Sequence, residues 1–186
     1  GRANLQRRGH LEAIAALERA VELESEDGGM WALLAEAYSQ SLKPELAIDA
    51  YREAIKWAPG KAAFYHNLGL LYQRAGHGAA AENMYRSALE REPELAGAWY
   101  NLGNLHLDRE QLAAAVAAYQ KALELEPDHA HAHVNLAMAW LYLDREDEAI
   151  AIYERFLEVY DEEDELKFKV RGQLEALRQE SGSSAQ

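Results

Sequence analysis

Three asparagines recur at the same place in an apolar phrase, and their side chains could bind a polypeptide backbone. Asn67, Asn101 and Asn135 stand in YHNLGLLY, WYNLGNLH and HVNLAMAW, 34 residues apart each time. A carboxamide can donate a hydrogen bond to a backbone carbonyl and accept one from a backbone N–H group. The spacing therefore indicates a row of amides able to hold an extended peptide, with an inherited structural motif as the alternative.

Three histidines lie in the segment DHAHAH (residues 128–133), the one cluster in the sequence that resembles a metal-binding site. His129 and His133 are four residues apart, a spacing that metal ligands use on a helix. However, His133 falls in the same 34-residue column as Trp31, Tyr65 and Trp99, so we interpret it as a packing residue. Since no cysteine and no converging carboxylate pair completes a site, we predict no metal and no cofactor.

The residue patterns of catalysis are missing. The sequence has no cysteine, no Gly-x-Ser-x-Gly motif and no serine placed with a histidine and an aspartate. The glycine-rich segment 76–81 lies between two helical patterns, which predicts a turn rather than a dinucleotide-binding loop. We interpret the acidic run Asp161–Glu165 as the first turn of a last helix, with a basic partner or a cation as the alternative. The chain is therefore predicted not to be an enzyme.

Charge and hydropathy exclude two other classes of partner. The 186 residues carry 32 acidic and 19 basic side chains, a formal net charge of −13. No basic stripe of the kind that displaces counterions from nucleic acid is visible. No apolar run approaches the roughly 18 residues that a membrane span needs. We expect a soluble protein that binds no nucleic acid and does not insert into a membrane; the cytoplasm is the expected location, with other compartments left open.

The asparagines belong to a helical repeat with a period of 34 residues. Two patterns of three-four apolar spacing, joined by a turn, make up residues 96–129. Each helix pair has apolar surface that only a stacked neighbour can bury. Small residues such as Gly69 and Gly103 would let the helices approach closely. Four columns repeat at this spacing: Leu34, Leu68, Leu102 and Leu136; Ala47, Ala81, Ala115 and Ala149; Tyr51, Tyr85, Tyr119 and Tyr153; and Pro59, Pro93 and Pro127.

The pattern resembles the tetratricopeptide repeat (TPR) family. The family motif is met by Trp99, Leu102, Gly103, Ala115, Tyr119, Ala122 and Pro127, with His106 in place of the first-helix tyrosine. The resemblance covers most of the chain. It implies an all-α fold, a right-handed TPR superhelix in which antiparallel helix pairs form a solenoid, with a capping helix at the C-terminal end.

The register divides the chain into repeats and two irregular ends. The repeat at 130–163 is expected to be the last full one, because Phe156 replaces a small residue and Asp161 replaces the proline. A further repeat stacked on it would be overpacked at Phe156. The expected parts are a partial repeat at 1–27 with its second helix at about 11–24, full repeats at 28–61, 62–95, 96–129 and 130–163, a capping helix at 164–180 and a disordered tail at 181–186.

The first helices of TPR proteins line a concave groove, so the resemblance implies that the asparagines face a peptide-binding groove. On a helical wheel Asn101 and Asn104 lie opposite Trp99 and Leu102. Amides would hold the peptide backbone and the other side chains would select its residues. The expected binding residues are Asn67, Asn101, Asn104, Asn135, His66, Tyr100, His131, Met138, Tyr142 and Arg74.

One variant of the family can be compared directly. Chaperone-binding TPR domains hold a C-terminal carboxylate with lysines, an arginine and two asparagines. Asn104 and Asn135 occupy the asparagine positions, but Tyr100 occupies the first lysine position and carries no charge. The sequence therefore does not match the carboxylate-binding variant.

We interpret the chain as a protein–protein interaction module, a scaffold that binds an extended peptide segment of a partner in its groove. Self-association into a homo-oligomer is one alternative, because a missing first helix before residue 11 would leave Ile14 and Leu17 under-covered. The non-catalytic targeting arm of a larger enzyme is the other. The partner's identity does not follow from the sequence.

Overall fold

The computed structural model describes the backbone of residues 2–184 and the side chains of residues 11–179. All regular structure in these residues is α-helical, as expected for a chain rich in Ala, Leu and Glu. The helices are α1 (Arg2–Leu23), α2 (Gly28–Gln40), α3 (Pro44–Trp57), α4 (Ala62–Arg74), α5 (Gly78–Arg91), α6 (Ala96–Asp108), α7 (Leu112–Leu125), α8 (Ala130–Tyr142), α9 (Glu146–Val159) and α10 (Glu165–Ser184).

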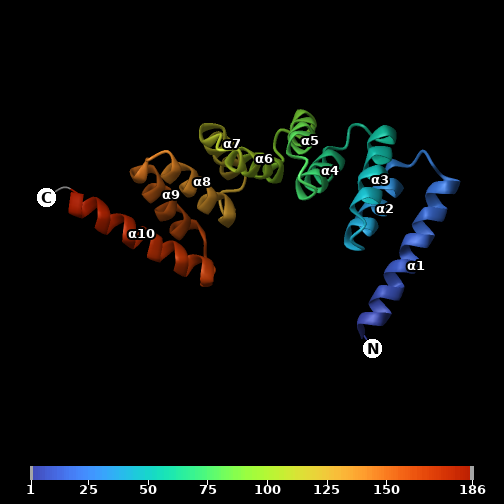
Figure 1. Cartoon of the computed structure of the whole chain (residues 1–186), viewed down its shortest axis with the longest axis horizontal. Helices are drawn as coiled ribbons and strands as arrows, with labels where there is room; N and C mark the ends of the chain where they lie inside the picture. The colour runs from blue at the N-terminus through green and yellow to red at the C-terminus, as the bar shows by residue number, and fades with distance from the viewer. Residues whose placement is uncertain (1, 185–186) are drawn as a thin grey trace. The chain divides into compact units, whose positions relative to one another are not determined.

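The chain divides into two compact units, Gly1–Pro93 and Glu94–Gln186. In the first unit α2 pairs with α3 and α4 pairs with α5, while α1 packs on α2. In the second unit α6 pairs with α7 and α8 with α9, and α10 packs on α9 (Figure 1). Each unit is thus a stack of antiparallel helix pairs, and the all-α prediction is confirmed.

A tyrosine of the second helix fills the seam of two of these pairs. A Cβ atom built on Gly69 would lie 2.6 Å from Cε1 of Tyr85, and one on Gly103 would lie 2.6 Å from Cε1 of Tyr119. Both tyrosines have no exposed surface. The expectation that these glycines permit close helix contact is confirmed, because any side chain there would overlap the ring.

The first helix of every full repeat ends in a left-handed residue. The backbone φ angles are 56° at Leu42, 78° at Gly76, 57° at Glu110 and 56° at Asp144. The next residue then donates its N–H to a carbonyl five residues back, as Lys43 does to Tyr38 at 2.9 Å. This is the Schellman arrangement, which reverses the chain direction between the helices of a pair.

The helix starts are partly those expected. Asp27 caps α2, since its carboxylate accepts from the N–H groups of Gly29 and Met30. The cap of α8 is His129, whose Nδ1 accepts from the N–H of Ala132 at 3.2 Å. An aspartate cap would be the usual expectation here, but Asp128 lies one residue too early, because α8 begins at Ala130.

The N-terminal helix differs from the sequence prediction. A single helix runs from Arg2 to Leu23, whereas a short stub and a separate helix at about 11–24 were expected. The expectation of poor coverage is wrong for Ile14, which is 4% exposed because it packs into a core with Leu34 and Ala35. Leu17 is half-buried against the same core. The structure thus weakens the sequence-based reason for expecting self-association.

The C-terminal helix α10 lies on α9 and covers its apolar face. Val170 and Leu174 are buried in one core with Phe156, which has no exposed surface. Lys167 is also buried; its Nζ donates to the carbonyl of Tyr160 at 2.7 Å and pairs with Glu163 at 3.0 Å. The helix continues to Ser184, where the sequence analysis expected a disordered tail from residue 181; residues 185 and 186 lie outside the described residues.

The acidic run before α10 organises the start of this helix. Asp164 accepts from the N–H of Lys167 at 2.9 Å, as a helix cap does, and from the hydroxyl of Tyr160 at 2.9 Å. The backbone N–H of Lys167 is the main reason that the pKa of Asp164 lies below its ordinary value. Glu163 pairs with Arg171 at 2.9 Å. These local contacts give Glu163 and Asp164 partners within the protein.

Candidate functional site

The candidate site is the asparagine-bearing side of the first helices within each unit, here called the amide face and described for each unit by itself. It contains Asn67 on α4 in the first unit, and Asn101 and Asn104 on α6 with Asn135 on α8 in the second. All four side chains are half-buried. Their positions follow from the register of the repeat, since the opposite side of each helix is taken by residues such as Leu102.

In the first unit a tyrosine hydroxyl orients Asn67. The amide Nδ2 donates to the hydroxyl of Tyr51 at 3.0 Å. Tyr51 is buried, and burial raises its pKa to about 12, so it stays a neutral hydroxyl at physiological pH. Asn67, Tyr51 and Arg74 line a cavity of about 200 Å³ together with Glu36, Ser39, Gln40, Leu70 and Leu71. His66 packs instead against Tyr85, with ring centroids 5.8 Å apart.

In the second unit the amides form a network. The hydroxyl of Tyr119 donates to Oδ1 of Asn104 at 2.7 Å, and Nδ2 of Asn135 donates to the same oxygen at 2.9 Å. Nδ2 of Asn135 also lies 3.4 Å from the hydroxyl of Tyr100. The ring of Tyr100 packs on the imidazole of His129, with centroids 4.6 Å apart. Three of the predicted site residues are therefore in direct contact.

These bonds determine which amide atoms could meet a ligand. Asn67 and Asn135 use Nδ2 within the protein, and Asn104 uses Oδ1. Within the described part of the chain, no protein partner is seen for Oδ1 of Asn67, Oδ1 of Asn135 or Nδ2 of Asn104. From the sequence we expected each amide to donate to a ligand and accept from it at once. In the structure one amide atom of Asn67, Asn104 and Asn135 already has a protein partner, so only the other amide atom of each could meet a ligand.

The tyrosines are the site residues that the sequence analysis missed. Tyr51 and Tyr119 were assigned only to the packing column, yet their hydroxyl groups fix the orientation of Asn67 and Asn104. The 34-residue period relates Tyr51 to Asn67 as it relates Tyr119 to Asn135. Because Tyr119 donates instead to Asn104, which stands in another column, the spacing was only a partial signal.

The remaining predicted residues of the second unit lie on α8. His131 is exposed and Met138 half-buried. Tyr142 is 61% exposed and lies apart from the amide network. It lines a separate cavity of about 610 Å³ with Leu107, Asp108, Glu110 and Leu112. The structure thus brings Tyr100 and the amides together and leaves Tyr142 at the end of the helix.

The histidine cluster does not converge. His129 is engaged as the cap of α8, and His133 is buried with Nδ1 3.2 Å from the carbonyl of His129. Burial is the main reason that the pKa of His133 lies below its ordinary value, and the charge of Arg155 lowers it further. In the described residues, no group of three metal-binding side chains comes together.

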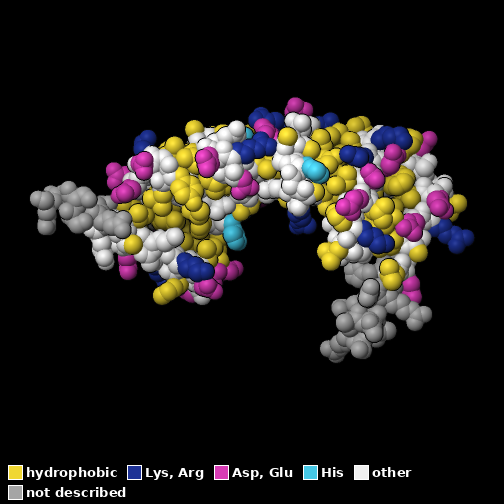
Figure 2. All heavy atoms as spheres, in the orientation of Figure 1, with side chains coloured by type: hydrophobic (Ala, Val, Ile, Leu, Met, Phe, Trp, Pro, Cys, Tyr) yellow, Lys and Arg dark blue, Asp and Glu magenta, His cyan; other side chains and the backbone are white. Residues whose placement is uncertain are grey.

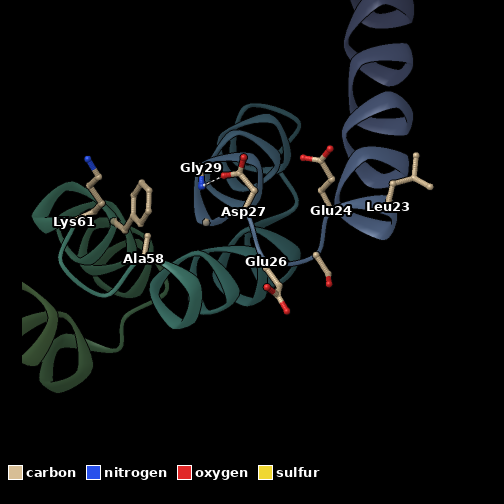
Figure 3. A pocket seen from close by; sticks show the side chains of 10 residues that line it. Leu23, Glu24, Glu26, Asp27, Gly29, Ala58 and Lys61 are labelled. Carbon is tan, nitrogen blue, oxygen red and sulfur yellow. Dashed lines mark hydrogen bonds between the residues drawn. The ribbon is translucent and has the colours of Figure 1, made fainter.

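Another cavity lies beside the turn between α1 and α2, with a volume of about 870 Å³. Its lining includes Leu23, Glu24, Glu26 and Lys61. The charged groups of Glu24, Glu26 and Lys61 point in different directions rather than toward a common point (Figure 3). Because no polar groups converge, this cavity is a poorer candidate than the amide face.

The surface charges are mixed. On the face drawn in Figure 2, acidic and basic side chains are interspersed over each unit, and no continuous basic stripe is seen there. None of the helices in the described part of the chain combines the length and the apolar character that crossing a membrane would require.

Comparison with known families agrees with the helix-pair register. Models of the tetratricopeptide repeat match residues 1–62, 62–95, 96–129 and 131–162. The chain belongs to the tetratricopeptide repeat family. The TPR matches at 62–95 and 96–129 have the bounds of two repeats expected from the sequence. No curated protein sequence is significantly similar to this TPR chain.

Several solved structures share the fold. The crystal structure of MamA is 21% identical with a TM-score of 0.76, over 85% of this chain and 86% of that one. YrrB, described as a TPR protein with an unusual peptide-binding site, is 18% identical with a TM-score of 0.73, over 91% and 88%. PilF of Pseudomonas aeruginosa is 20% identical with a TM-score of 0.74, over 94% and 84%. At these identities the likeness establishes an all-α TPR fold.

Proposed function

We propose that this TPR chain is a protein-interaction module that binds an extended peptide segment of a partner along the amide face. The observation that carries the proposal is the set of oriented amides of Asn67, Asn104 and Asn135, each held by a tyrosine or by another amide. Because these groups are fixed before a ligand arrives, binding costs little side-chain entropy. The peptide-binding site of YrrB supports the idea that this fold accepts such a ligand.

The amides suit a peptide backbone rather than a particular side chain. Oδ1 of Asn135 would accept from a peptide N–H, and Nδ2 of Asn104 would donate to a peptide carbonyl. Neighbouring helix axes are roughly 10 Å apart, and an extended chain advances about 3.3 Å per residue. Within the second unit, the amides on α6 and α8 would then meet peptide residues about three apart.

Other residues of the amide face would select side chains. In the second unit the ring of Tyr100 and the thioether of Met138 offer apolar contact, and His131 is exposed beside them. In the first unit Arg74 lines the cavity next to Asn67 and would favour an acidic peptide side chain. His66 and Asn101 complete the proposed set.

The expected affinity is modest. Each hydrogen bond contributes about 0.5–1.5 kcal/mol net, and association costs several kcal/mol before any gain appears. A dissociation constant in the micromolar range follows unless apolar anchors add to it. The proposal assigns the chain no catalytic step.

The test uses peptides selected from a random phage-displayed library on the intact chain, with affinity measured by calorimetry. Replacing Asn67, Asn101 and Asn135 together by alanine should weaken the selected peptides at least tenfold. Asn83→Ala is the matched control, because Asn83 is exposed on the second helix α5 and lies off the amide face. Circular dichroism checks that the triple variant remains folded.

A second comparison separates backbone from side-chain recognition. N-methylation of peptide amide groups removes the N–H groups from which Asn67 and Asn135 would accept hydrogen bonds. It should therefore weaken binding more than a change of the neighbouring side chain. Peptides that bind the triple variant and the parent chain equally would rule out the amide face as their site.

A further inference from the structure

One column of first-helix aromatics contacts the turn that precedes its own helix. Nε1 of Trp31 donates to the carbonyl of Ser25 at 2.8 Å. The hydroxyl of Tyr65 donates to the carbonyl of Pro59 at 3.1 Å. In both cases the ring reaches a carbonyl six residues back. The contact has an apolar part, the ring, and a polar part, the donor at its far end.

His133 stands in the same column but cannot make this contact. An imidazole is shorter than an indole or a phenol, and Nδ1 of His133 is turned to the carbonyl of His129 at 3.2 Å. Its ring packs on Phe156, with centroids 5.9 Å apart. The equivalent carbonyl, six residues back, is that of Pro127. A space remains between His133 and that turn.

This space is an open cavity of about 540 Å³ within the second unit. Leu136 is buried at its base, and Leu123 and Ile152 are half-buried beside it. The lining is completed by Pro127, His133, Gln120, Glu124 and the exposed Arg155. Three aliphatic side chains therefore share this cavity with a carboxamide, a carboxylate and a guanidinium group.

A guanidinium also accompanies the ring in the first unit. Arg91 lies 3.8 Å from the ring centroid of Tyr65, and its Nε donates to the carbonyl of Pro59. Arg155, which pairs with Glu158 at 2.9 Å, lines the cavity at His133 and could cover an aromatic ring in the same way. A cation over an aromatic face stabilises such a contact.

We infer that the cavity at His133 binds the side chain of a tryptophan from a partner protein. The ring would pack on Leu123, Leu136 and Ile152, with Arg155 against its face. The indole N–H would donate to the carbonyl of Pro127, as Trp31 does to Ser25. A phenylalanine lacks this donor, and an aliphatic side chain lacks both the donor and the π face. A tyrosine has both, as Tyr65 shows, but a cation interacts best with the face of a tryptophan, so tryptophan is the occupant that we infer.

The cavity is independent of the amide face. Its lining comes from α7, α9 and the packing side of α8, and includes none of the proposed peptide-binding residues. The inference therefore does not rest on the proposed function, and either can fail alone.

The test is a methyl NMR titration of the whole chain with N-acetyl-tryptophanamide. Saturable shifts are expected at the methyl groups of Leu136 and Ile152, with N-acetyl-leucinamide as the aliphatic control. His133→Trp fills the cavity from inside and should raise the dissociation constant at least tenfold. Leu123→Phe fills the cavity from α7 and should have the same effect, so it provides the test if His133→Trp does not fold. His131→Trp adds the same residue on the exposed side of α8 and should leave binding unchanged.

Three results would overturn the inference. The first is the absence of saturable shifts up to the solubility of the probe. The second is binding that persists in His133→Trp or in Leu123→Phe. The third is binding that disappears in His131→Trp, which would place the probe on the amide face. Shifts lost in both filled variants and kept in His131→Trp would establish the site.

Discussion

At the scale of single residues, the tyrosines of the second helices differ in what their hydroxyl groups contact. Tyr51 accepts from Asn67, Tyr119 donates to Asn104, and Tyr85 donates to Gln73 at 2.7 Å. The hydroxyl of Tyr153 is buried and has no hydrogen-bond partner among the described residues. In the last repeat Met138 occupies the column of Asn104, and a thioether is a weak acceptor.

This difference predicts opposite effects of one substitution. Tyr119→Phe should lower the free energy of unfolding by about 1 kcal/mol, because it removes a hydrogen bond. Tyr153→Phe should leave it unchanged or raise it, because a buried hydroxyl without a partner is unfavourable. Both rings have no exposed surface, so the packing changes are matched. Urea denaturation measures the two values, and equal losses would contradict the explanation.

The sequence predicted which residues share the amide face but not what they contact. Asn104 and Asn135 could be placed on one side of their helices from the 34-residue period and a helical wheel. The hydrogen bond between Asn104 and Asn135 could not be predicted, because it depends on which amide atom of Asn104 accepts from the hydroxyl of Tyr119. A helical wheel gives the direction of a side chain and does not resolve the two ends of a carboxamide.

At the scale of the helices, the turns within the four full repeats share a residue with positive φ, and only one of the four has glycine at that position. Gly76 has a positive φ at no steric cost. Leu42 has the same kind of conformation with a side chain that is 88% exposed. A left-handed residue with a Cβ atom costs roughly 1–2 kcal/mol, and aspartate tolerates the conformation better than leucine does.

Leu42→Gly should therefore raise the free energy of unfolding by about 0.5–1 kcal/mol, after the entropy of an unfolded glycine is allowed for. Asp144→Gly should give a smaller gain. Gly76→Ala should destabilise by a similar amount, although an added Cβ there would meet nothing within 4 Å. Thermal and urea denaturation of the three variants provide the measurement. A loss of stability in Leu42→Gly would show that the exposed leucine makes a contact worth more than the strain.

Helix identity was predictable from the sequence, and the ends were less so. The apolar columns and prolines fixed the alternation of helices between residues 28 and 163. The length of α1 was missed, because the motif stops at Ala13 while the chain before it can continue the helix without completing a repeat. The length of α10 was missed as well, because its last turn reaches Ser184 through a Gly-Ser-rich segment of low helix propensity.

For the molecule as a whole, the buried tyrosines predict sensitivity to alkaline pH. Burial raises the pKa of Tyr51 to about 12, and burial with the adjacent carboxylate of Glu18 raises that of Tyr38 to about 12. An unfolded tyrosine ionises near pH 10. Raising the pH between these values therefore favours the unfolded state, and the stability that is complete below pH 10 is lost progressively toward pH 12.

The measurement is the urea midpoint at pH 8, 10 and 11, with tyrosinate absorbance recorded in parallel. We expect the midpoint to fall above pH 10 while the buried tyrosines ionise only as the chain unfolds. Tyr51→Phe should reduce the slope, because it removes one of the linked groups. A midpoint that does not change with pH in this range would contradict the linkage.

The contact between glycine and tyrosine within a repeat has a consequence for how such a protein can change in length. Gly69 and Tyr85 lie in one 34-residue segment, and Gly103 and Tyr119 lie in the next. Duplicating the part of the gene that encodes such a segment would add both the glycine and the tyrosine that packs against it in a single event. The array could thus be extended by tandem duplication without a compensating mutation elsewhere.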